Sequence, residues 1–292
     1  MVGYPPGGGH DFTARVIAQR LSEVLKQPFV VENRTGASGT IAAESIAKGP
    51  ADGYSFLVAS PAETVVGALA GLKMNYDWEK DLAPVTVIGE TPLAIAIHPS
   101  VPAKTIQELL AYAKSNPGKL SYGTPGSGSS MHFAGESLKA ISGIFIVHIP
   151  YRGAGPAIAD LLGGQVPMGI AGLPPVVAPH KAGKLRILAV TSAKRSDALP
   201  DIPAMAELPG FTGYNFTNWT GIFMAAKTPQ AVTDRLAAEI GKAVQEPAIR
   251  EKLLAAGVDP LGLTTPQFVL FLQREKNTYS KVAKARNIKA DD

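Results

Sequence analysis

The chain of 292 residues is long enough for two domains of ordinary size or for one large α/β unit. Hydrophobic residues make up 46% and charged residues 18% of the chain, which is the composition of a globular protein and excludes a disordered or fibrous one. The net charge is only +4, and no cluster of Lys and Arg carries interleaved aromatic residues, so we expect no nucleic-acid partner. The absence of cysteine excludes a disulfide framework and thiolate chemistry.

The two ends of the chain give little indication of its compartment. No apolar run approaches the roughly 18 residues of a membrane span. The sequence starts inside an expected strand at residues 2–4, so we expect a signal peptide to have been removed ahead of it. The lack of a signal peptide in this sequence therefore does not indicate a cytoplasmic protein.

The first third of the chain alternates helices and strands. Between Asp11 and Lys26, the apolar residues fall on one face of a helix. The run FVVENR at 29–34 is typical of a buried strand. The remaining expected elements are helices near 39–48 and 62–71 and strands at 2–4, 54–60 and 93–98.

After Pro99 the alternation begins again. Thr105 and Glu108 form a capping-box pattern that opens a helix, which ends before Pro117. Thr228-Pro229 predicts the start of a mostly helical C-terminal region. Between them we expect strands at 120–124, 144–151, 165–172 and 185–192, helices at 131–142 and 155–162, and a long strand or crossing segment at 215–224.

Two separate strand–helix series rich in Val, Ile and Leu indicate an α/β protein with two lobes, each built on a mostly parallel sheet covered by helices. We expect the chain to cross near residues 97–99 and to return near 219–223. The predicted lobes are 1–98 with 222–292, and 99–221.

Two glycine-rich loops lie where strands give way to helices. GGGHDF, residues 7–12, precedes the first helix, and TPGSGSSMH, residues 124–132, occupies the corresponding place in the second series. Such loops expose backbone amides at helix N-termini and favour anionic oxygen groups. Neither loop continues as a Walker motif or fits the dinucleotide fingerprint, so a carboxylate is favoured over a phosphate.

Purely structural roles are an alternative explanation for the same residues. The glycines are also compatible with tight turns that bind nothing. Asp11 is a candidate cap of the first helix, and one or more of Ser127, Ser129 and Ser130 are candidate caps of the helix that follows them.

An enzymatic function finds little support. His10, Asp11, Ser129, Ser130 and His132 include the residue types of a nucleophilic hydrolase, but no serine lies in a Gly-x-Ser-x-Gly elbow. The five histidines form no close metal-ligand pair. We therefore expect no catalytic residues, no metal and no cofactor.

Taken together, these motifs closely resemble the tripartite tricarboxylate transporter solute receptors, the Bug (TctC-like) family. The resemblance covers almost the whole chain. Its landmarks are PPGGGHDFTAR (5–15), the segments 27–57 and 108–138, VHIPYRGAGPAIADLLGGQVPM (147–168), the segment 182–208, and GIFMAAKTP (221–229).

The resemblance implies a Venus-flytrap receptor of the type II periplasmic binding protein architecture, exported to the periplasm and working as a monomer. Such a receptor captures a small organic carboxylate between its lobes and delivers it to a membrane transporter made of a large and a small subunit. An orphan sensor acting through a protein partner would have the same sequence features, and a hydrolase is the remaining alternative.

The resemblance also implies the residues that contact the ligand, mainly through backbone amides. Asn33, Arg34 and the loop at 35–39 are expected to support the fold instead. In the first lobe the implied contacts are Gly8, Gly9, His10, Asp11, Phe12, Ser60, Pro61 and Ala62. In the second lobe they are Thr124, Gly126, Ser127, Gly128, Ser129, Ser130, His132, Tyr151, Arg152, Gly153, Ala154, Ala171 and Gly172.

One segment departs from the family pattern. Many relatives carry an Asp after the strand at 165–170, whereas this chain has Gly169-Ile170-Ala171-Gly172-Leu173. Without that carboxylate an amine-bearing ligand is disfavoured. The expected ligand is a di- or tricarboxylate or an aromatic carboxylate such as terephthalate, and not an amino acid.

Overall fold

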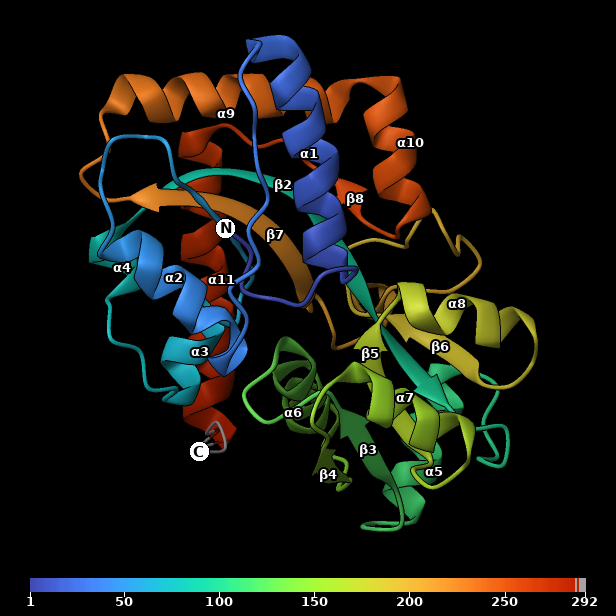
Figure 1. The fold of residues 1–292 in the computed structure, drawn as a ribbon. Helices are drawn as coiled ribbons and strands as arrows, with labels where there is room; N and C mark the ends of the chain where they lie inside the picture. The colour runs from blue at the N-terminus through green and yellow to red at the C-terminus, as the bar shows by residue number, and fades with distance from the viewer. Residues whose placement is uncertain (287, 289–292) are drawn as a thin grey trace. The chain divides into compact units, whose positions relative to one another are not determined.

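The computed structural model describes residues 1–286 and 288, which divide into two compact α/β units (Figure 1). Unit 1 contains Met1–Glu90 and Trp219–Thr278. Unit 2 contains Thr91–Asn218 and the described residues from Tyr279 onward. The chain therefore passes between the units three times, because helix α11 (Thr265–Arg286) continues from unit 1 into unit 2.

Unit 1 is built around strands that pair with antiparallel neighbours. β1 pairs with β7 in the register Leu57 to Phe223, and β8 pairs with the first part of β2 at Gly89 and Glu90. The elements of this unit are α1 (Gly9–Leu25), a 3-10 turn (Ala37–Gly39), α2 (Thr40–Ala47), β1 (Leu57–Ala59), α3 (Val65–Ala70), α4 (Trp78–Asp81), the first part of β2 (Leu82–Ile97), most of β7 (Thr217–Ala225), α9 (Gln230–Gln245), α10 (Pro247–Ala255), β8 (Asp259–Pro260) and most of α11.

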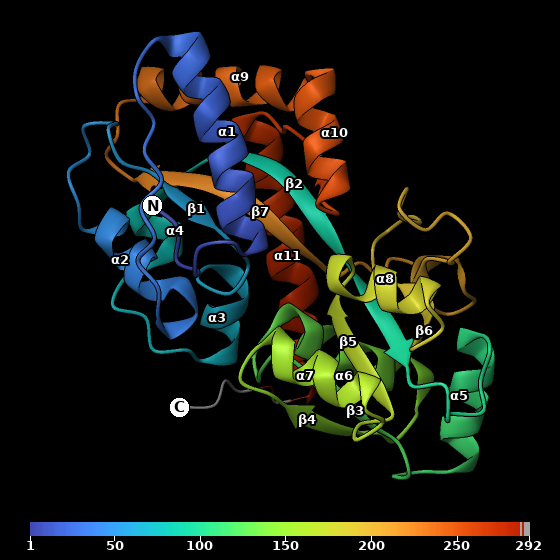
Figure 2. The same ribbon diagram turned by 45° about the vertical axis from the view of Figure 1, so that its right-hand side comes forward.

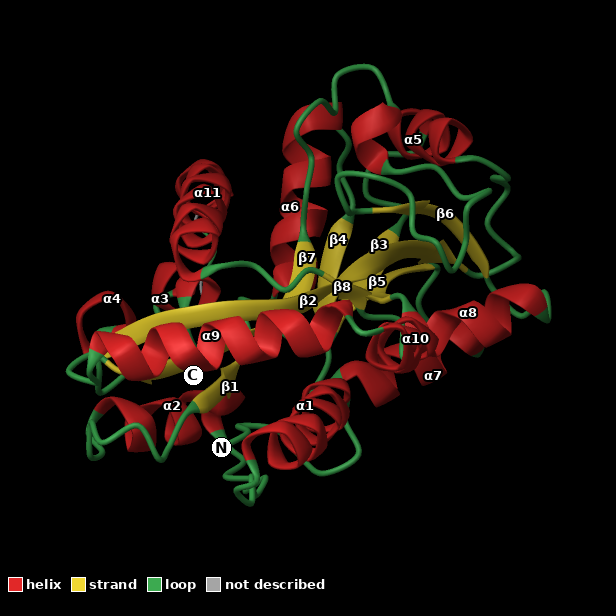
Figure 3. Ribbon diagram, turned by 90° about the horizontal axis from the view of Figure 1, so that it is seen from above, coloured by secondary structure: helices red, strands yellow, loops and turns green. Residues whose placement is uncertain are grey.

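Helices cover both faces of this sheet (Figures 2 and 3). On one face, Ile222 of β7 packs in a buried cluster with Ile17 of α1 and Ile240 of α9. On the other face, Trp219 and Phe223 of β7 contact Phe268 of α11. Alternate residues of one strand thus supply two cores, as the period of a β-strand requires.

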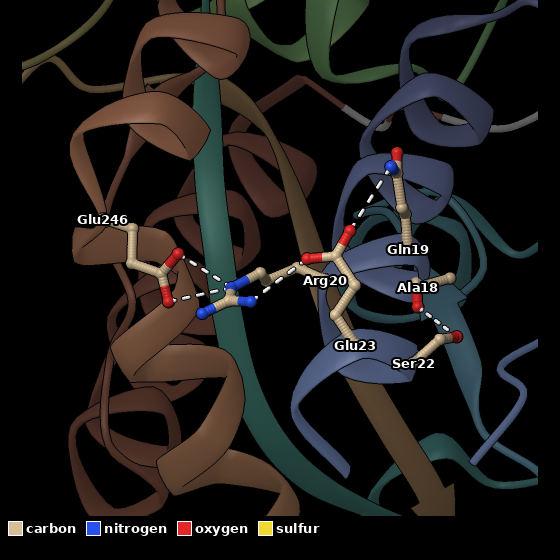
Figure 4. A network of polar contacts seen from close by, with 6 residues as sticks. All are labelled: Ala18, Gln19, Arg20, Ser22, Glu23 and Glu246. Atoms are coloured by element: carbon tan, nitrogen blue, oxygen red, sulfur yellow. Dashed lines mark hydrogen bonds and ion pairs between the residues drawn. The ribbon is translucent and has the colours of Figure 1, made fainter. Parts of the chain in front are cut away.

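A polar network joins α1 to the junction of α9 and α10 (Figure 4). Arg20 Nε donates to both carboxylate oxygens of Glu246, at 3.0 and 2.8 Å, and Arg20 Nη1 donates to Glu23 at 3.1 Å. Ser22 Oγ donates to the carbonyl of Ala18 at 2.8 Å. Because these side chains are partly exposed, we ascribe the packing of α1 to its apolar face and not to this network.

Unit 2 contains parallel strand pairs. β3 pairs in parallel with β4 and β5, whereas the second part of β2 pairs antiparallel with β5 and β6. The elements of unit 2 are the end of β2, α5 (Ile106–Ser115), β3 (Ser121–Thr124), α6 (Ser130–Ser142), β4 (Val147–Pro150), α7 (Ala154–Leu162), β5 (Met168–Gly172), α8 (Pro174–Lys181), β6 (Arg186–Val190) and a 3-10 turn (Met205–Glu207).

The α/β architecture in two units is confirmed, but the sheets are mixed and not mostly parallel. Within the described residues, β3 pairs in parallel with β4 and β5. The long strand β2 accounts for much of the difference, because its pairs with β5, β6 and β8 are all antiparallel. β2 also places the first passage at Glu90, not at residue 98, since one continuous strand serves both units.

The two strands expected at 2–4 and 29–34 in unit 1 are replaced by isolated bridges. Val2 pairs in parallel with Asn33 and with Val58, and residues 29–34 otherwise form no strand. This segment flanks a hollow of about 790 Å³, and Val30 is 85% exposed there. Its apolar residues therefore line a hollow instead of a paired sheet.

Most of the other predicted elements are present with shifted ends, whereas α4, α8 and β8 were not predicted. β1 occupies only three of the seven residues expected at 54–60, and α3 starts three residues after the expected helix at 62. None of the helices formed by the described residues combines the length and the apolar character that a membrane crossing needs.

Candidate ligand-binding loops

The first glycine loop leads directly into α1. The helix begins at Gly9, two residues earlier than predicted, and its N-cap, Gly8, provides no side-chain cap. Gly7 to Gly9 are exposed, and a Cβ built on Gly9 would meet nothing within 4 Å. The first turn of a helix has amides without intrahelical partners. The amide of Gly8 donates to the carbonyl of Pro5 at 3.3 Å, so the open space beside this helix start adjoins Gly9.

The buried carboxylate of Asp11 links the first glycine loop to α1 and to Asn33 by hydrogen bonds. Its carboxylate accepts from the amide of Gly7 at 2.9 Å, from Arg15 Nε at 2.9 Å and from Asn33 Nδ2 at 2.8 Å. Burial opposes ionisation, but these hydrogen bonds outweigh it and keep the pKa of Asp11 below its ordinary value. Asp11 is therefore engaged with the chain itself, and Asn33 has the supporting role expected of it.

Replacing Asp11 by alanine is expected to lower the free energy of unfolding by about 2–3 kcal/mol, since a buried charged acceptor of three hydrogen bonds is lost. Arg15→Ala is the matched control: the Arg15 side chain is 51% exposed, and losing its end of the pair should cost less than about 1 kcal/mol. Urea denaturation at pH 7 measures both, and equal losses would contradict the role assigned to Asp11.

His10 is a neutral component of the loop. Its ring stacks on Tyr4 with centroids 4.9 Å apart, and Nδ1 lies 2.9 Å from Thr220 Oγ1. Burial lowers the pKa of His10 to about 4, so the imidazole is uncharged at neutral pH. Phe12, the last predicted contact in this loop, is 38% exposed.

The segment after β1 is organised by a buried carboxylate. Glu63 accepts from the amide of Ser60 at 2.8 Å, from Ser60 Oγ at 2.5 Å and from Tyr4 Oη at 2.8 Å. The amide of Ser60 is therefore already hydrogen-bonded to Glu63, and the amide of Ala62 donates to Ser60 Oγ at 3.1 Å. Pro61 is buried, and its carbonyl accepts the amide of Val66 at 2.9 Å.

In unit 2, the second glycine loop follows β3 and is joined to the loop after β4. The amide of Tyr151 donates to the carbonyl of Thr124, and the amide of Gly153 donates to that of Pro125, both at 2.9 Å. The two loops of unit 2 that are predicted to contact the ligand therefore lie together at the carboxyl ends of two parallel strands, where ligands of α/β proteins bind.

Ser129 is the N-cap of α6. Its Oγ accepts from the amide of His132 at 3.2 Å and donates to the carbonyl of Gly126 at 2.7 Å. The capping alternative therefore holds for Ser129, whose hydroxyl bonds to backbone groups and not to the imidazole of His132. Ser130 is buried and Ser127 is half-buried.

Two stacked histidines support the second loop. The rings of His132 and His148 have centroids 3.9 Å apart and an interplanar angle of 13°. Nδ1 of His132 accepts from the amide of Gly128 at 3.1 Å, and Nε2 of His148 lies 2.7 Å from Thr124 Oγ1. His132 thus fixes the loop through its ring, a role that the sequence pattern had left open.

The other predicted residues of unit 2 differ in accessibility. Arg152 and Ala154 are exposed, while Tyr151 is half-buried and donates from Oη to Asp160 at 2.9 Å. Ala171 is buried and pairs with Ala94 within the sheet, next to Gly172 at the end of β5. In the described residues, no group of three or more His, Cys, Asp and Glu side chains is arranged to hold a metal ion.

Two α/β units, each with a glycine-rich loop that leads into a helix, are the architecture of a two-lobed solute-binding receptor. The family model described as "Tripartite tricarboxylate transporter family receptor" matches residues 13–288, and the chain belongs to this family.

Relatives and solved structures agree with the assignment. Protein BugT of Bordetella pertussis is 35% identical over 290 residues, covering 99% of this chain and 89% of BugT. The structure of R. palustris Rpa4515 with adipate superimposes with a TM-score of 0.87 at 35% identity, covering 99% and 96% of the two chains. MatC from Rhodopseudomonas palustris with bound malate gives a TM-score of 0.80 at 26% identity, covering 96% and 97%.

Proposed function

We propose that this receptor binds a small organic carboxylate through the backbone amides of its two glycine loops. In this proposal the ligand is captured between the lobes, in the periplasm, by a monomeric receptor that delivers it to a transporter with a large and a small membrane subunit. The observation that carries the proposal is the uncapped, exposed N-terminus of α1 at Gly8 and Gly9. The adipate and malate named for two structural relatives support the same ligand class.

The charges of the loops favour recognition by amides over recognition by a basic side chain. His10 is neutral, Arg15 is paired with Asp11, and Arg152 is exposed. An amide hydrogen bond to a charged group contributes about 1.5–3 kcal/mol, and micromolar affinity corresponds to about 8 kcal/mol. A few amides from each loop are therefore sufficient.

We further propose that the ligand lacks an amino group. The end of β5 and the following residues, Ala171 to Leu173, offer no carboxylate that could pair with an ammonium group. Succinate, adipate, citrate and terephthalate are expected to bind more tightly than aspartate or glutamate. Tight binding of either amino acid with weak binding of all four acids would overturn this part of the proposal.

A thermal-shift screen against mono-, di- and tricarboxylates, aromatic acids and amino acids tests the function. A ligand that binds only the folded state adds about 2.7 kcal/mol of stability at 100 times its dissociation constant. We expect a clear shift with at least one carboxylate, which remains chemically unchanged after prolonged incubation. If none of the carboxylates shifts the melting temperature, or if the compound is consumed, the result would contradict a receptor of this kind.

Ser127→Ala provides a sensitive test of backbone recognition. If amides hold the ligand, removing this half-buried hydroxyl should weaken binding by only about 1 kcal/mol, or roughly fivefold. Calorimetric titration of the strongest carboxylate found in the screen measures the change. A loss of a thousandfold would show that the hydroxyl, and not the backbone, dominates recognition.

A further inference from the structure

Three side chains of unit 1 join the two segments that are expected to contact the ligand. Tyr4 precedes the glycine loop, and its ring stacks on His10. Its Oη lies 2.7 Å from Ser60 Oγ and donates to Glu63 Oε2 at 2.8 Å. Tyr4, Ser60 and Glu63 therefore form one hydrogen-bonded cluster between residues 7–10 and residues 60–62.

The Glu63 carboxylate is buried in this cluster without a basic partner among its hydrogen bonds. The residue is fully buried, and the donors to its carboxylate include the amide and hydroxyl of Ser60, the hydroxyl of Tyr4 and the amide of Glu63 itself, all neutral groups. Gly39 packs so closely that a Cβ there would lie 2.9 Å from Glu63 Cδ. A charge enclosed in this way responds strongly to any further charge that approaches.

The other ionisable groups around Glu63 do not titrate near neutral pH. Tyr76 donates to the Glu63 carbonyl at 2.6 Å, and burial raises the pKa of both Tyr76 and Tyr4 well above the ordinary value. Glu44 also faces Tyr76, and its hydrogen bond with Lys48 lowers its pKa. The pKa of His10 is lowered to about 4 by burial. Burial raises the pKa of Glu63 itself to about 7, despite the hydrogen bonds that it accepts.

We propose that Glu63 is a proton-linked positioning residue, and that binding of a carboxylate ligand at residues 7–10 and 60–62 is accompanied by uptake of a proton by Glu63. This inference rests on the proposed function. A ligand carboxylate beside Ser60 brings a second negative charge toward Glu63, and a nearby like charge favours the protonated acid. By linkage, protonated Glu63 in turn favours binding of the anion.

Protonation also changes the direction of the hydrogen bonds in the cluster. Ionised Glu63 can only accept, so a hydrogen bond from Ser60 Oγ or Tyr4 Oη to its carboxylate uses the single hydrogen of that hydroxyl. A protonated Glu63 donates one hydrogen bond, which releases the hydrogen of its new acceptor to another partner. The acid form therefore makes the cluster a better neighbour for an anion than the carboxylate form does.

Calorimetric titration of adipate between pH 6 and 8.5 tests the inference. The wild-type dissociation constant should rise above pH 7 by up to about tenfold per pH unit, because one proton is linked to binding. Titrations at pH 7.5 in phosphate and in Tris, whose ionisation enthalpies differ, should show net proton uptake. In Glu63→Gln, which cannot ionise, both effects should disappear while binding remains.

A matched control and a second variant separate the outcomes. Glu275→Gln removes another buried carboxyl group of unit 1, one that bonds Trp219 Nε1, and should retain the proton uptake. Tyr4→Phe removes one donor to ionised Glu63 and should move the weakening of binding to higher pH. Binding without proton uptake in the wild type, or unchanged uptake in Glu63→Gln, would overturn the inference and leave the proposed function intact. No binding of any carboxylate at any pH would overturn the proposed function itself.

Discussion

Replacing Gly9 by valine is expected to weaken carboxylate binding about a hundredfold while leaving the protein stably folded. The substitution should be tolerated because a Cβ at Gly9 meets nothing within 4 Å, and Gly9 lies at the first position of α1 with no left-handed backbone. The branched side chain would occupy the space through which a ligand approaches the amides of the first turn. Losing one or two charge-assisted hydrogen bonds of about 1.5–3 kcal/mol each corresponds to such a loss.

Calorimetry and thermal denaturation of the same samples check this prediction. Gly241→Val on α9 is the control, because a Cβ there makes only an ordinary contact of 3.8 Å with the carbonyl of Gly262. Gly128 is a poorer choice for the second loop, since its φ of 71° would strain any β-branched residue and mix folding with binding. Unchanged affinity in a folded Gly9→Val protein would show that the ligand does not approach this loop.

The second large effect concerns the pH dependence of stability. Glu275 of α11 is buried and accepts a hydrogen bond from Trp219 Nε1 at 3.0 Å. Burial raises the pKa of Glu275 to about 8, with a smaller contribution from Glu90. The unfolded chain releases this proton near pH 4.5, so between pH 4.5 and about 8 the folded state holds more protons. The free energy of unfolding must then fall as pH rises, by up to about 5 kcal/mol at about 1.4 kcal/mol for each pH unit.

Glu275→Gln keeps an acceptor for Trp219 but removes the ionisation. The variant should match the wild type near pH 5 and be more stable than it at pH 9, as measured by urea denaturation across this range. Glu79→Gln is the control, because Glu79 forms an exposed ion pair with Lys276 and should change stability by less than about 1 kcal/mol. Parallel pH profiles for wild type and Glu275→Gln would contradict the prediction.

The sequence was most informative where local chemistry decides the structure. Both glycine loops precede helices as predicted, and Ser129 caps α6 as one alternative proposed. The strand–helix alternation also indicated the α/β class and its two units. These features depend on short-range spacing, which one sequence displays directly.

Strand pairing was harder to predict, because it depends on partners distant in the chain. The first part of β2 was missed, since Pro84, Gly89 and Pro92 interrupt the apolar pattern of a strand that continues from Leu82 to Ile97. The run at 29–34 has the composition of a strand, but among the described residues its one bridge is that of Asn33 with Val2. The composition of a segment indicates its preference for a β-strand, but it does not show whether a neighbouring strand is available to pair with it.

The hydrogen-bonded cluster of Tyr4, Ser60 and Glu63 next to the first glycine loop could not be predicted from the sequence either. Tyr4 and Glu63 are 59 residues apart and meet only in the folded protein. The one sequence feature that pointed to this cluster was Glu63, an acidic residue among the mostly small and apolar residues of 60–71. An acidic residue in such a segment is more simply interpreted as exposed at the surface. The amide recognition that we propose has the same limit, because every residue except proline supplies an N–H and the identity of the ligand leaves no mark on the loop.

Calorimetric titration of the wild-type protein with adipate, malate and aspartate tests the central claim most directly. We expect saturable binding of at least one of the two non-amino dicarboxylates with a stoichiometry of one per chain, no turnover, and much weaker binding of aspartate. Saturable binding of aspartate with no heat from adipate or malate would contradict a receptor that selects carboxylates without an amino group.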